Sequence, residues 1–327
     1  MIKKLHFILL LLCIMSAPFI SLAQTQDSVP EKPPVLGEDR APSFFNNIIS
    51  NPAYTGIFGG HNILVNAGID KPFFTFRNLY HSQYYNAAYD VAFGKKRNNA
   101  IGVYYSDMKG GILSSKTIGV NYARSFNLTQ DKKFYQKLRV GVSIGEKWIV
   151  SDWNRVSFGD MIDPAYGFMW NTSEMRSEPL RKDINFELGA WYQNPVFYFG
   201  IGTKNLTEPD EANYGVSLIP RELNVSTGGK IKICNNFAIH PSLCLSYISR
   251  FKGKLSSLSP SITGSFKNNY FLGLSYKDLN KITAHAGVIA FNCVSLSVAY
   301  GISKNTDLEG FGYPAYIGGD LRINIKN

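Results

Sequence analysis

The sequence predicts an all-β protein, a closed antiparallel transmembrane β-barrel of about fourteen strands. Three observations predict this fold. Apolar and polar residues alternate strictly over Asp183–Thr203, and the connections between strand-length segments alternate between short and long. In addition, no segment after Ala23 approaches the ~20 consecutive apolar residues of a membrane helix. A chain that crosses a membrane without such a helix must do so as a closed barrel, because only that arrangement satisfies every backbone polar group in lipid.

The first 23 residues have the pattern of a cleaved secretory signal peptide. Lys3 and Lys4 carry the positive charge, Leu5–Ile20 is apolar, and Ser21–Ala23 is a small-residue cleavage site. A transmembrane anchor is the alternative, but the apolar run is short and ends in a cleavage-like triplet. We therefore expect residues 1–23 to be removed and the mature chain to be exported.

Residues 24–60 form an N-terminal segment that we expect to be either periplasmic or a plug in the barrel. Gln24–Arg40 is rich in proline, glutamate and polar residues, a composition typical of a flexible leader. Ser43–Ser50 is apolar enough to dock on another surface. The Asn-Pro and Thr-Gly pairs of Asn51–Gly56 prevent a long helix there. An ordinary ordered loop before the first strand is the alternative.

Asp183–Thr203 indicates two antiparallel strands joined by a tight turn at Asn194 and Pro195. In a soluble sandwich the polar face of such strands meets water and the apolar face meets a core. In an outer-membrane barrel the polar face lines the lumen and the apolar face meets lipid. The apolar face contains Ile184, Phe186, Leu188, Ala190, Tyr192, Phe197, Phe199 and Ile201, and the opposite face contains Asn185, Glu187, Gly189, Trp191, Tyr198, Gly200 and Gly202.

Residues 61–327 are predicted to form the barrel. The alternation is clearest in Lys281–Ala290 and Val294–Ile302, where valine, isoleucine, leucine and alanine alternate with serine, threonine, histidine and glycine. The predicted strands are approximately 61–67, 84–93, 100–107, 116–126, 136–149, 183–193, 196–203, 221–233, 237–249, 258–266, 270–277, 281–290, 294–302 and 316–325.

The lengths of the connections decide between a barrel and a soluble sandwich. An even-stranded barrel with both termini in the periplasm has short periplasmic turns and longer external loops, whereas a sandwich has no reason to sort its loops by parity. Two connections fit this rule poorly. Asn127–Tyr135 is long although it falls among the short turns, and Asp278–Asn280 is short although it falls among the long loops. Met108–Ser115 is of intermediate length and falls among the long loops. Aromatic residues lie near strand ends, where interfacial girdles belong: Tyr192, Phe237, Tyr270 and Tyr276.

The formal net charge of +10 comes from basic residues that are scattered through turns and loops. We find no basic helix and no aromatic-interleaved motif, so no nucleic-acid partner is expected. Solvated loop charges explain this pattern, and an anionic membrane surface or an acidic partner is the alternative. The sparse, odd set of cysteines in the mature chain, Cys234, Cys244 and Cys293, argues against a disulfide framework.

No catalytic, metal or cofactor site is assembled by the sequence, and we expect a protein that is not an enzyme. Gly141–Gly145 matches the GxSxG pattern around Ser143, but it lies inside an alternating strand and lacks the strand-to-helix turn that a nucleophilic serine needs. No histidines pair at metal-ligand spacing. Asp152, Asp160 and Asp163 cluster in the longest loop, but their spacing does not match a calcium-binding loop.

Several short motifs, taken in order, resemble the PorP/SprF family of type IX secretion system outer-membrane proteins. Asn51–Gly56 looks like the family's N-terminal element, which is an Asn-Pro-Ala-Tyr sequence followed by a small residue and glycine. The later blocks that carry the resemblance are Ile101–Val103 with Asp107, Gly110 and Gly111, Lys137–Ser143, Asp152–Trp153, Phe158–Pro164, Phe186–Trp191 and Phe199–Asn205. The chain departs from many outer-membrane barrels at its end, which is not aromatic.

The resemblance implies a non-enzymatic outer-membrane barrel that works with the type IX machinery to export or anchor a secreted surface protein, such as a gliding adhesin. The implied partners are the adhesin or the C-terminal domain of another cargo, the periplasmic and outer-membrane secretion components, and the lipid bilayer. A passive porin or outer-membrane substrate transporter is the alternative, and a membrane hydrolase that uses Ser143 is a third possibility. The residues that we predict to contact a partner are Asn51, Pro52, Tyr54, Trp153, Asp160, Asp163 and Trp170.

Overall fold

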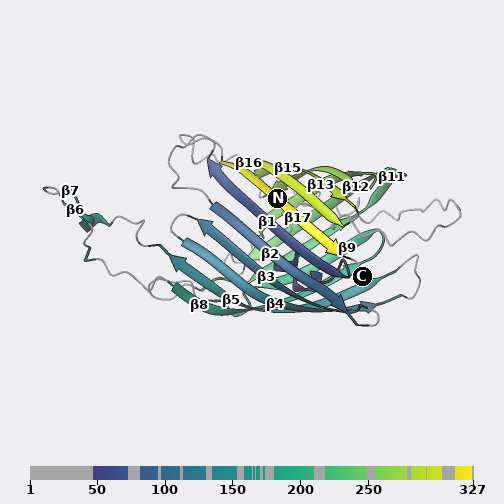
Figure 1. Ribbon diagram of the computed structural model, residues 1–327, viewed down its shortest axis with the longest axis horizontal. Coiled ribbons are helices and arrows are strands. Elements are labelled where there is room, and N and C mark those ends of the chain that lie inside the picture. Colours follow the sequence, from purple (N-terminus) through teal and green to yellow (C-terminus); the bar gives the residue numbers. More distant parts are fainter. Residues whose placement is uncertain are drawn as a thin grey trace, which may run out of the picture. The chain divides into compact units, whose positions relative to one another are not determined.

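The structure, a computed structural model, contains a closed antiparallel β-barrel. It describes residues 47–325 except 73–81, 95–96, 111–112, 130–134, 153–157, 164, 166, 170–171, 174–179, 210–217, 249–254, 278–280, 292 and 304–313. The predicted signal peptide therefore lies outside the described residues. Pairing of the first strand with the last, and of β10 with β12, closes the sheet on itself. Because β10 and β11 are two parts of one strand, the ring has the predicted fourteen strands (Figure 1).

The elements of the described residues follow the predicted order. Two short helical elements precede the barrel, α2 (Asn47–Ser50) and η2 (Pro52–Tyr54), and η5 (Gly159–Met161) lies in the longest loop beside the two short strands β6 (Ile162–Asp163) and β7 (Gly167–Phe168). The barrel strands are β1 (His61–Pro72), β2 (Ser82–Phe93), β3 (Asn99–Gly110), β4 (Leu113–Asn127), β5 (Lys137–Ser151), β8 (Leu180–Gln193), β9 (Phe197–Lys204), β10 (Glu222–Gly229), β11 (Ile231–Cys234), β12 (Phe237–Ile248), β13 (Leu255–Phe266), β14 (Tyr270–Lys277), β15 (Lys281–Ala290), β16 (Val294–Ser303) and β17 (Pro314–Ile325).

Several predicted boundaries are wrong; β1, for example, continues to Pro72, beyond its predicted end at residue 67. Two further differences concern the β3–β4 connection and the predicted strand 221–233. The sequence predicts a connection over Met108–Ser115, but Met108 pairs with Ser115 and Gly110 pairs with Leu113, so that β3 and β4 form a tight hairpin. The predicted strand 221–233 is interrupted at Lys230, between β10 and β11. In both places backbone pairing with neighbouring strands, rather than the local hydrophobic pattern, decides where a strand ends.

The barrel has its apolar residues outside and its polar residues inside. On β8, Ile184, Phe186 and Leu188 are 46–53% exposed, whereas Asn185 and Glu187 are 4–5% exposed. The same holds across the sheet, because one cross-strand row on the outer wall is entirely apolar and each of its members is 40–49% exposed. That row consists of Tyr89, Val103, Val120, Ile144 and Phe186. A surface of this kind is stable in contact with lipid, not water.

The two ends of the barrel differ in their connections. His61, at the start of β1, pairs with Ile325, at the end of β17, so both strands meet at one end. The turn between β8 and β9 lies at this end, and the side chain of Asn194 closes it by accepting hydrogen bonds from the backbone N–H groups of Val196 and Phe197 at 2.8 Å. The longest connection, between β5 and β8, lies at the other end. No helix among the described residues is long and apolar enough to cross a membrane.

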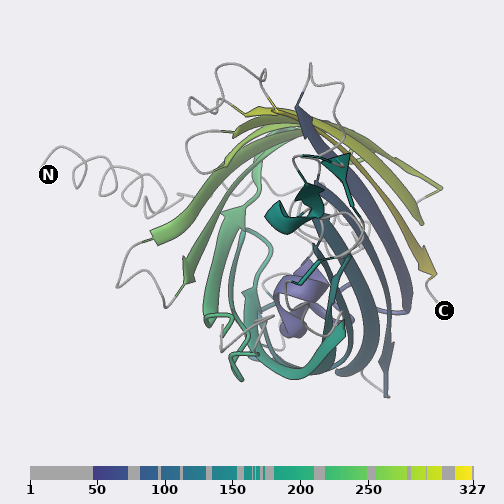
Figure 2. The ribbon, with the colours of Figure 1, turned by 90° about the vertical axis from the view of Figure 1, so that its left-hand side faces the viewer.

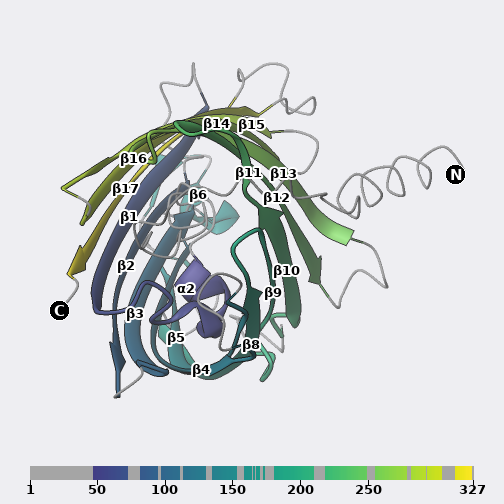
Figure 3. The same ribbon diagram turned by 90° about the vertical axis from the view of Figure 1, so that its right-hand side faces the viewer.

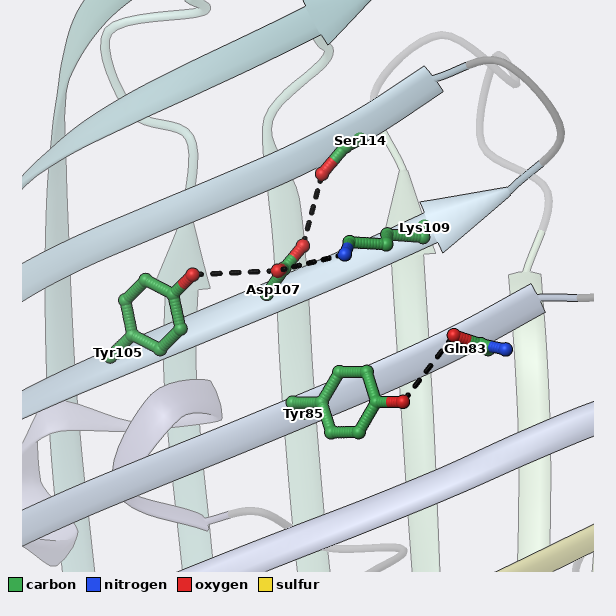
Figure 4. A network of polar contacts seen from close by, with 6 residues as sticks. All are labelled: Gln83, Tyr85, Tyr105, Asp107, Lys109 and Ser114. Atoms are coloured by element: carbon green, nitrogen blue, oxygen red, sulfur yellow. Dashed lines mark hydrogen bonds and ion pairs between the residues drawn. The ribbon is translucent and has the colours of Figure 1, made fainter.

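A polar cluster marks the outer wall at the end of the long connections (Figure 4). The side chain of Asp107 accepts hydrogen bonds from Ser114 Oγ at 3.0 Å and Tyr105 Oη at 3.4 Å, and Lys109 Nζ lies 3.9 Å from it. Farther round the wall, Lys182 lies 5.5 Å from the ring centre of Trp148 and 3.8 Å from Glu146. Charged and aromatic side chains at one height are typical of the interface between lipid chains and headgroups.

Candidate functional site

A row of small residues crosses six neighbouring strands on the inner wall of the barrel. Each member is directly paired with the next one, so the side chains at this level leave space inside the ring. The row runs from β2 to β9 and contains only alanine and glycine. This small-residue row consists of Ala92, Ala100, Ala123, Gly141, Gly189 and Gly202.

Residues 47–60, which we call the lumenal segment, lie on the small-residue row. Views from opposite sides both show α2 inside the ring of strands (Figures 2 and 3). A Cβ atom added to Gly141 would collide with the backbone of Pro52 and Ala53, and one added to Gly189 would collide with Asn51. One added to Gly202 would lie 2.7 Å from the carbonyl oxygen of Ser50. The glycines therefore permit an approach that no larger residue allows.

Asn51 joins the lumenal segment to two strands. Its amide Nδ2 donates to the carbonyl oxygens of Ala190 on β8 and Ile201 on β9, at 3.3 and 3.1 Å. Its Oδ1 accepts a hydrogen bond from the backbone N–H of Ala53 at 3.0 Å and so caps η2, in which Pro52 occupies the first turn. One side chain thus both starts the turn and attaches it to the wall.

Two buried charges of opposite sign hold the other end of η2. Arg139 on β5 donates from Nε to the carbonyl oxygen of Ala53 at 3.1 Å, and from Nη2 to that of Thr55. Asp90 on β2 accepts a hydrogen bond from the backbone N–H of Gly56 at 2.6 Å. The two side chains are 4% and 7% exposed. Charge-assisted hydrogen bonds in such a water-poor site are strong, so this clamp fixes the segment in one position.

Aromatic rings fill the space around the clamp. The ring of Tyr54 meets Trp191 edge to face, with ring centres 5.2 Å apart, and Trp191 stacks on Tyr198 at 5.1 Å. Phe58 lies 4.4 Å below the guanidinium of Arg322 on β17. These contacts connect the lumenal segment to opposite parts of the ring, and Ala53 and Tyr54 form a buried cluster with Trp191 and Tyr198.

The structure separates the residues predicted to contact a partner into two groups. Asn51, Pro52 and Tyr54 are buried in the lumen, where they contact the barrel itself. Asp160 is exposed in the loop between β5 and β8, and the backbone of Asp163 belongs to β6. Trp153 and Trp170 lie outside the described residues. No contact between the two groups is recorded among the described residues.

Asp160 organises the described part of the longest loop. Its carboxylate accepts hydrogen bonds from Thr172 Oγ1 at 2.8 Å and from the backbone N–H of Ser173 at 2.6 Å. The hydrogen bond from Thr172, followed by that from the Ser173 N–H, lowers the pKa of the Asp160 carboxyl below its ordinary value. The carboxylate thus joins η5 to the chain after β7.

Sequence reasoning missed the partners of the lumenal segment. Asp90 and Arg139 each stand on the polar face of an alternating strand, and glycines recur on the polar faces of β5, β8 and β9. A charge or a glycine on such a face is a usable signal that something approaches the inner wall closely. The strand register that aligns the residues, however, is visible only in the folded chain.

The arrangement gives no support to hydrolysis. Ser143 lies in the middle of β5, as the sequence predicts, on the inner wall and 4% exposed. His285 is buried on β15, where it is 2.9 Å from Thr263 Oγ1, and His240 on β12 is 2.9 Å from Ser265 Oγ. Among the described residues, no three histidine, cysteine, aspartate or glutamate side chains come together as a metal site.

A sequence model of the family described as type IX secretion system membrane protein PorP/SprF matches residues 43–316, which is most of the chain. The chain belongs to the PorP/SprF family. The match begins just before the lumenal segment and ends in β17, so that it includes both the segment and the barrel. The family is one of membrane proteins, and the fold is that of an outer-membrane barrel.

Three solved structures are similar to this PorP/SprF chain. The CymD monoaromatic hydrocarbon channel has a TM-score of 0.50 at 13% identity, over 86% of this chain and 93% of that one. The toluene transporter TbuX of Ralstonia pickettii has 0.49 at 11%, over 85% and 93%. A Pseudomonas aeruginosa FadL homologue has 0.48 at 11%, over 88% and 96%. At 13% identity, the likeness to the CymD channel shows a shared fold only. No curated protein matches the chain.

Proposed function

We propose that this PorP/SprF protein is a non-enzymatic outer-membrane barrel that binds a secreted surface protein, such as a gliding adhesin, and exports or anchors it. The partners would be the C-terminal domain of that cargo and the periplasmic and outer-membrane components of type IX secretion. In this proposal residues 1–23 are a cleaved signal peptide, and residues 24–60 include the part that plugs the lumen, with docking on the periplasmic machinery as the alternative role. Family membership supports the link to secretion.

The observation that carries the proposal is the lumenal segment. It lies across six strands of the inner wall and is held by Asn51, Asp90 and Arg139, so the lumen is obstructed on the side of β2–β9. A barrel whose lumen is partly occupied by its own chain is suited to holding a partner, whereas a diffusion channel needs a clear passage. We therefore assign the lumenal segment the role of a plug.

Exposed apolar side chains in the longest loop support a contact surface outside the membrane. Ile162 on β6 is 64% exposed, Phe168 on β7 is 47% exposed and the neighbouring Met169 is 39% exposed. Apolar residues grouped on one small hairpin are typical of a protein-binding surface. We propose that this hairpin, together with the predicted loop residues Trp153, Asp160, Asp163 and Trp170, contacts the cargo.

The test is co-purification of cargo from native membranes, with identification of the bound chains. Deleting Asn51–Gly56 should abolish partner association while the barrel remains heat-modifiable on gels, which reports folding. Replacing Ile162 and Phe168 by serine should weaken association, whereas replacing the exposed Leu128, in the connection between β4 and β5 at the opposite end of the barrel, by serine serves as the matched control. The proposed role would be refuted if the Asn51–Gly56 deletion and the variant of Ile162 and Phe168 both retained as much cargo as the unaltered protein.

A passive porin is the second candidate, and one observation favours it. The inner wall of β10, β12 and β13, which follow β9 around the ring, is lined by small hydroxyl side chains that are half-buried. Ser242 and Ser261, for example, are 2.6 Å apart across two strands. The lining serines are Ser226, Ser242, Ser246, Ser257, Ser259 and Ser261. Planar-bilayer recordings separate the candidates, because a porin conducts with the lumenal segment in place and a plugged scaffold conducts little.

A further inference from the structure

Three aromatic side chains form a row on the outer wall of β12, β13 and β14, at the end of the barrel that has the short turns. Phe237 is directly paired with Phe266, and Phe266 is directly paired with Tyr270. All three are exposed, and the adjacent residue on each strand is buried on the inner side. Aromatic rings near strand ends are typical of the boundary between lipid chains and headgroups. We call these three residues the aromatic row.

The turn between β13 and β14 places a lysine against the aromatic row. Lys267 Nζ lies 5.6 Å from the ring centre of Phe266, within reach of a cation–π contact. Backbone hydrogen bonds hold this turn from both sides. The N–H of Lys267 donates to the carbonyl oxygen of Asn236, and the N–H of Ile289 donates to that of Asn269, both at 2.7 Å. The backbone that carries the lysine is therefore fixed at the rim of the barrel.

A second lysine reaches the same turn from the junction of β10 and β11. Lys230 Nζ donates to the side-chain oxygen Oδ1 of Asn268 at 3.3 Å. An ammonium group can only donate, so this contact fixes which side of the Asn268 amide faces the lysine. The Nδ2 group of Asn268 faces the other way, and its N–H donors have no partner among the described residues. We call Lys230, Lys267 and Asn268 the turn cluster.

The charge around the turn cluster is positive. The residues of the short turns that the structure describes include no aspartate or glutamate. Basic side chains at the other end of the barrel are accompanied by carboxylates instead, because Lys109, Lys182 and Arg221 lie 3.9, 3.8 and 3.4 Å from acidic side chains. Positive groups that are not neutralised by neighbouring carboxylates attract anions to a surface. The turn cluster is therefore suited to a negatively charged ligand.

We propose that the turn cluster and the aromatic row bind an anionic phospholipid of the periplasmic leaflet. Its phosphate accepts hydrogen bonds from the two ammonium groups and from the Asn268 amide, all of which are donors suited to phosphate. Its acyl chains lie on the apolar wall beyond the row, where Ile262, Leu272 and Leu274 are exposed. A soluble acidic protein meets only the charged rim, whereas a phospholipid matches both the charge and the apolar wall. The proposal does not depend on cargo binding.

Native mass spectrometry of the mature protein in detergent tests the proposal. The probes are phosphatidylglycerol, which is anionic, and phosphatidylcholine with the same acyl chains, which has no net charge. Phosphatidylglycerol should bind more tightly to the unaltered protein. Combining Lys230→Gln with Lys267→Gln should weaken phosphatidylglycerol binding by roughly fivefold for each lysine and leave phosphatidylcholine binding unchanged. Combining Lys230→Arg with Lys267→Arg keeps both charges and should keep the affinity for phosphatidylglycerol.

Lys109→Gln combined with Lys182→Gln is the matched control, because it removes the same charge at the other end of the barrel. It should leave phosphatidylglycerol binding unchanged, and heat-modifiable gel mobility verifies that each variant is folded. Inorganic phosphate should not displace the lipid, which separates a lipid site from a site for free phosphate. Displacement by phosphate or an equal loss in the control overturns the proposal. Equal binding of the two lipids also overturns it and would indicate an acidic periplasmic protein as the ligand.

Discussion

The carboxylate of Asp90 accepts a hydrogen bond of 2.6 Å from the backbone N–H of Gly56, although the two residues belong to different layers of the molecule. Asp90 is part of the barrel wall, and Gly56 ends the turn that lies inside it. Gly56 has a positive φ of 70°, which glycine adopts without strain, and its Cα faces the small side chain of Ala100. The barrel wall and the lumenal segment therefore have complementary shapes and hydrogen-bonding groups at Gly56.

The first prediction concerns the small-residue row. Gly141→Ala places a methyl group against the backbone of Pro52 and Ala53, which cannot move aside as a flexible side chain would. We expect displacement of the lumenal segment at a cost of ~1–3 kcal/mol. Limited chymotrypsin digestion at Tyr54 and Phe58 should become faster. Gly264→Ala, where the nearest atom is 3.3 Å away on the ring of Phe237, is the matched control, and equal digestion of both variants would contradict the prediction.

The second prediction compares the two charges of the clamp. Arg139→Leu leaves the carbonyl oxygens of Ala53 and Thr55 without their donor, and each buried, unsatisfied acceptor costs ~1–3 kcal/mol. Asp90→Asn keeps an oxygen that can accept from Gly56, so its effect should be smaller. The measurement is the temperature at which the detergent-solubilised barrel loses its heat-modifiable gel mobility. A larger shift for Asp90→Asn than for Arg139→Leu would show that the guanidinium does not hold the segment.

The third prediction concerns the outer wall. Ile144→Arg places a charge in the apolar row of the wall, and the expected loss of folding free energy is ~2–4 kcal/mol near the membrane centre. Glu146→Arg lies one outward position closer to the long connections, beside Lys182, and should cost about 0–1 kcal/mol. Denaturant titration of folding into lipid vesicles measures both. Equal losses for the two variants would mean that the apolar row is not at the centre of the membrane.

The fourth prediction is a pH dependence in the longest loop. The pKa of Asp160 is lowered in the folded loop, so its contribution is complete above the unfolded pKa, about 3.9, and is lost as the pH falls through the folded value. Backbone hydrogen exchange at Ser173 should therefore accelerate in strong acid. Asp160→Ala should give the same acceleration at neutral pH, and Asp152→Ala, which changes another exposed carboxylate of the same loop, should not.

Most of the barrel could be predicted from the sequence because each strand carries its own local signal. Alternation in Asp183–Thr203 gives the two faces, and the Asn194 turn gives the hairpin, both of which the structure confirms. Polar residues such as Ser114 and Ser115 carry no such signal, and the ends of β3 and β4 were therefore predicted incorrectly. Their pairing follows from the neighbouring strands instead.

The lumenal site was harder to predict because it depends on long-range register. Gly141 and Gly189 are unremarkable small residues in two separate strands, and only strand pairing places them side by side under Pro52. Likewise, Arg139 and Asp90 have no sequence motif in common. The Asn51–Gly56 motif was visible, but nothing in the sequence specifies that its side chains face inward against the chain's own wall.

The pairing of His61 with Ile325 also constrains the order of assembly. The strand made first borders the strand made last, so the cylinder cannot be sealed until translation and export of nearly the whole polypeptide are complete. Residues 47–60 precede both partners in synthesis, and they can be enclosed as the remaining strands wrap around them. If the strands assemble around residues 47–60 in this way, the contacts inside the barrel guide its closure. The pairing of β1 with β17 is then the last step.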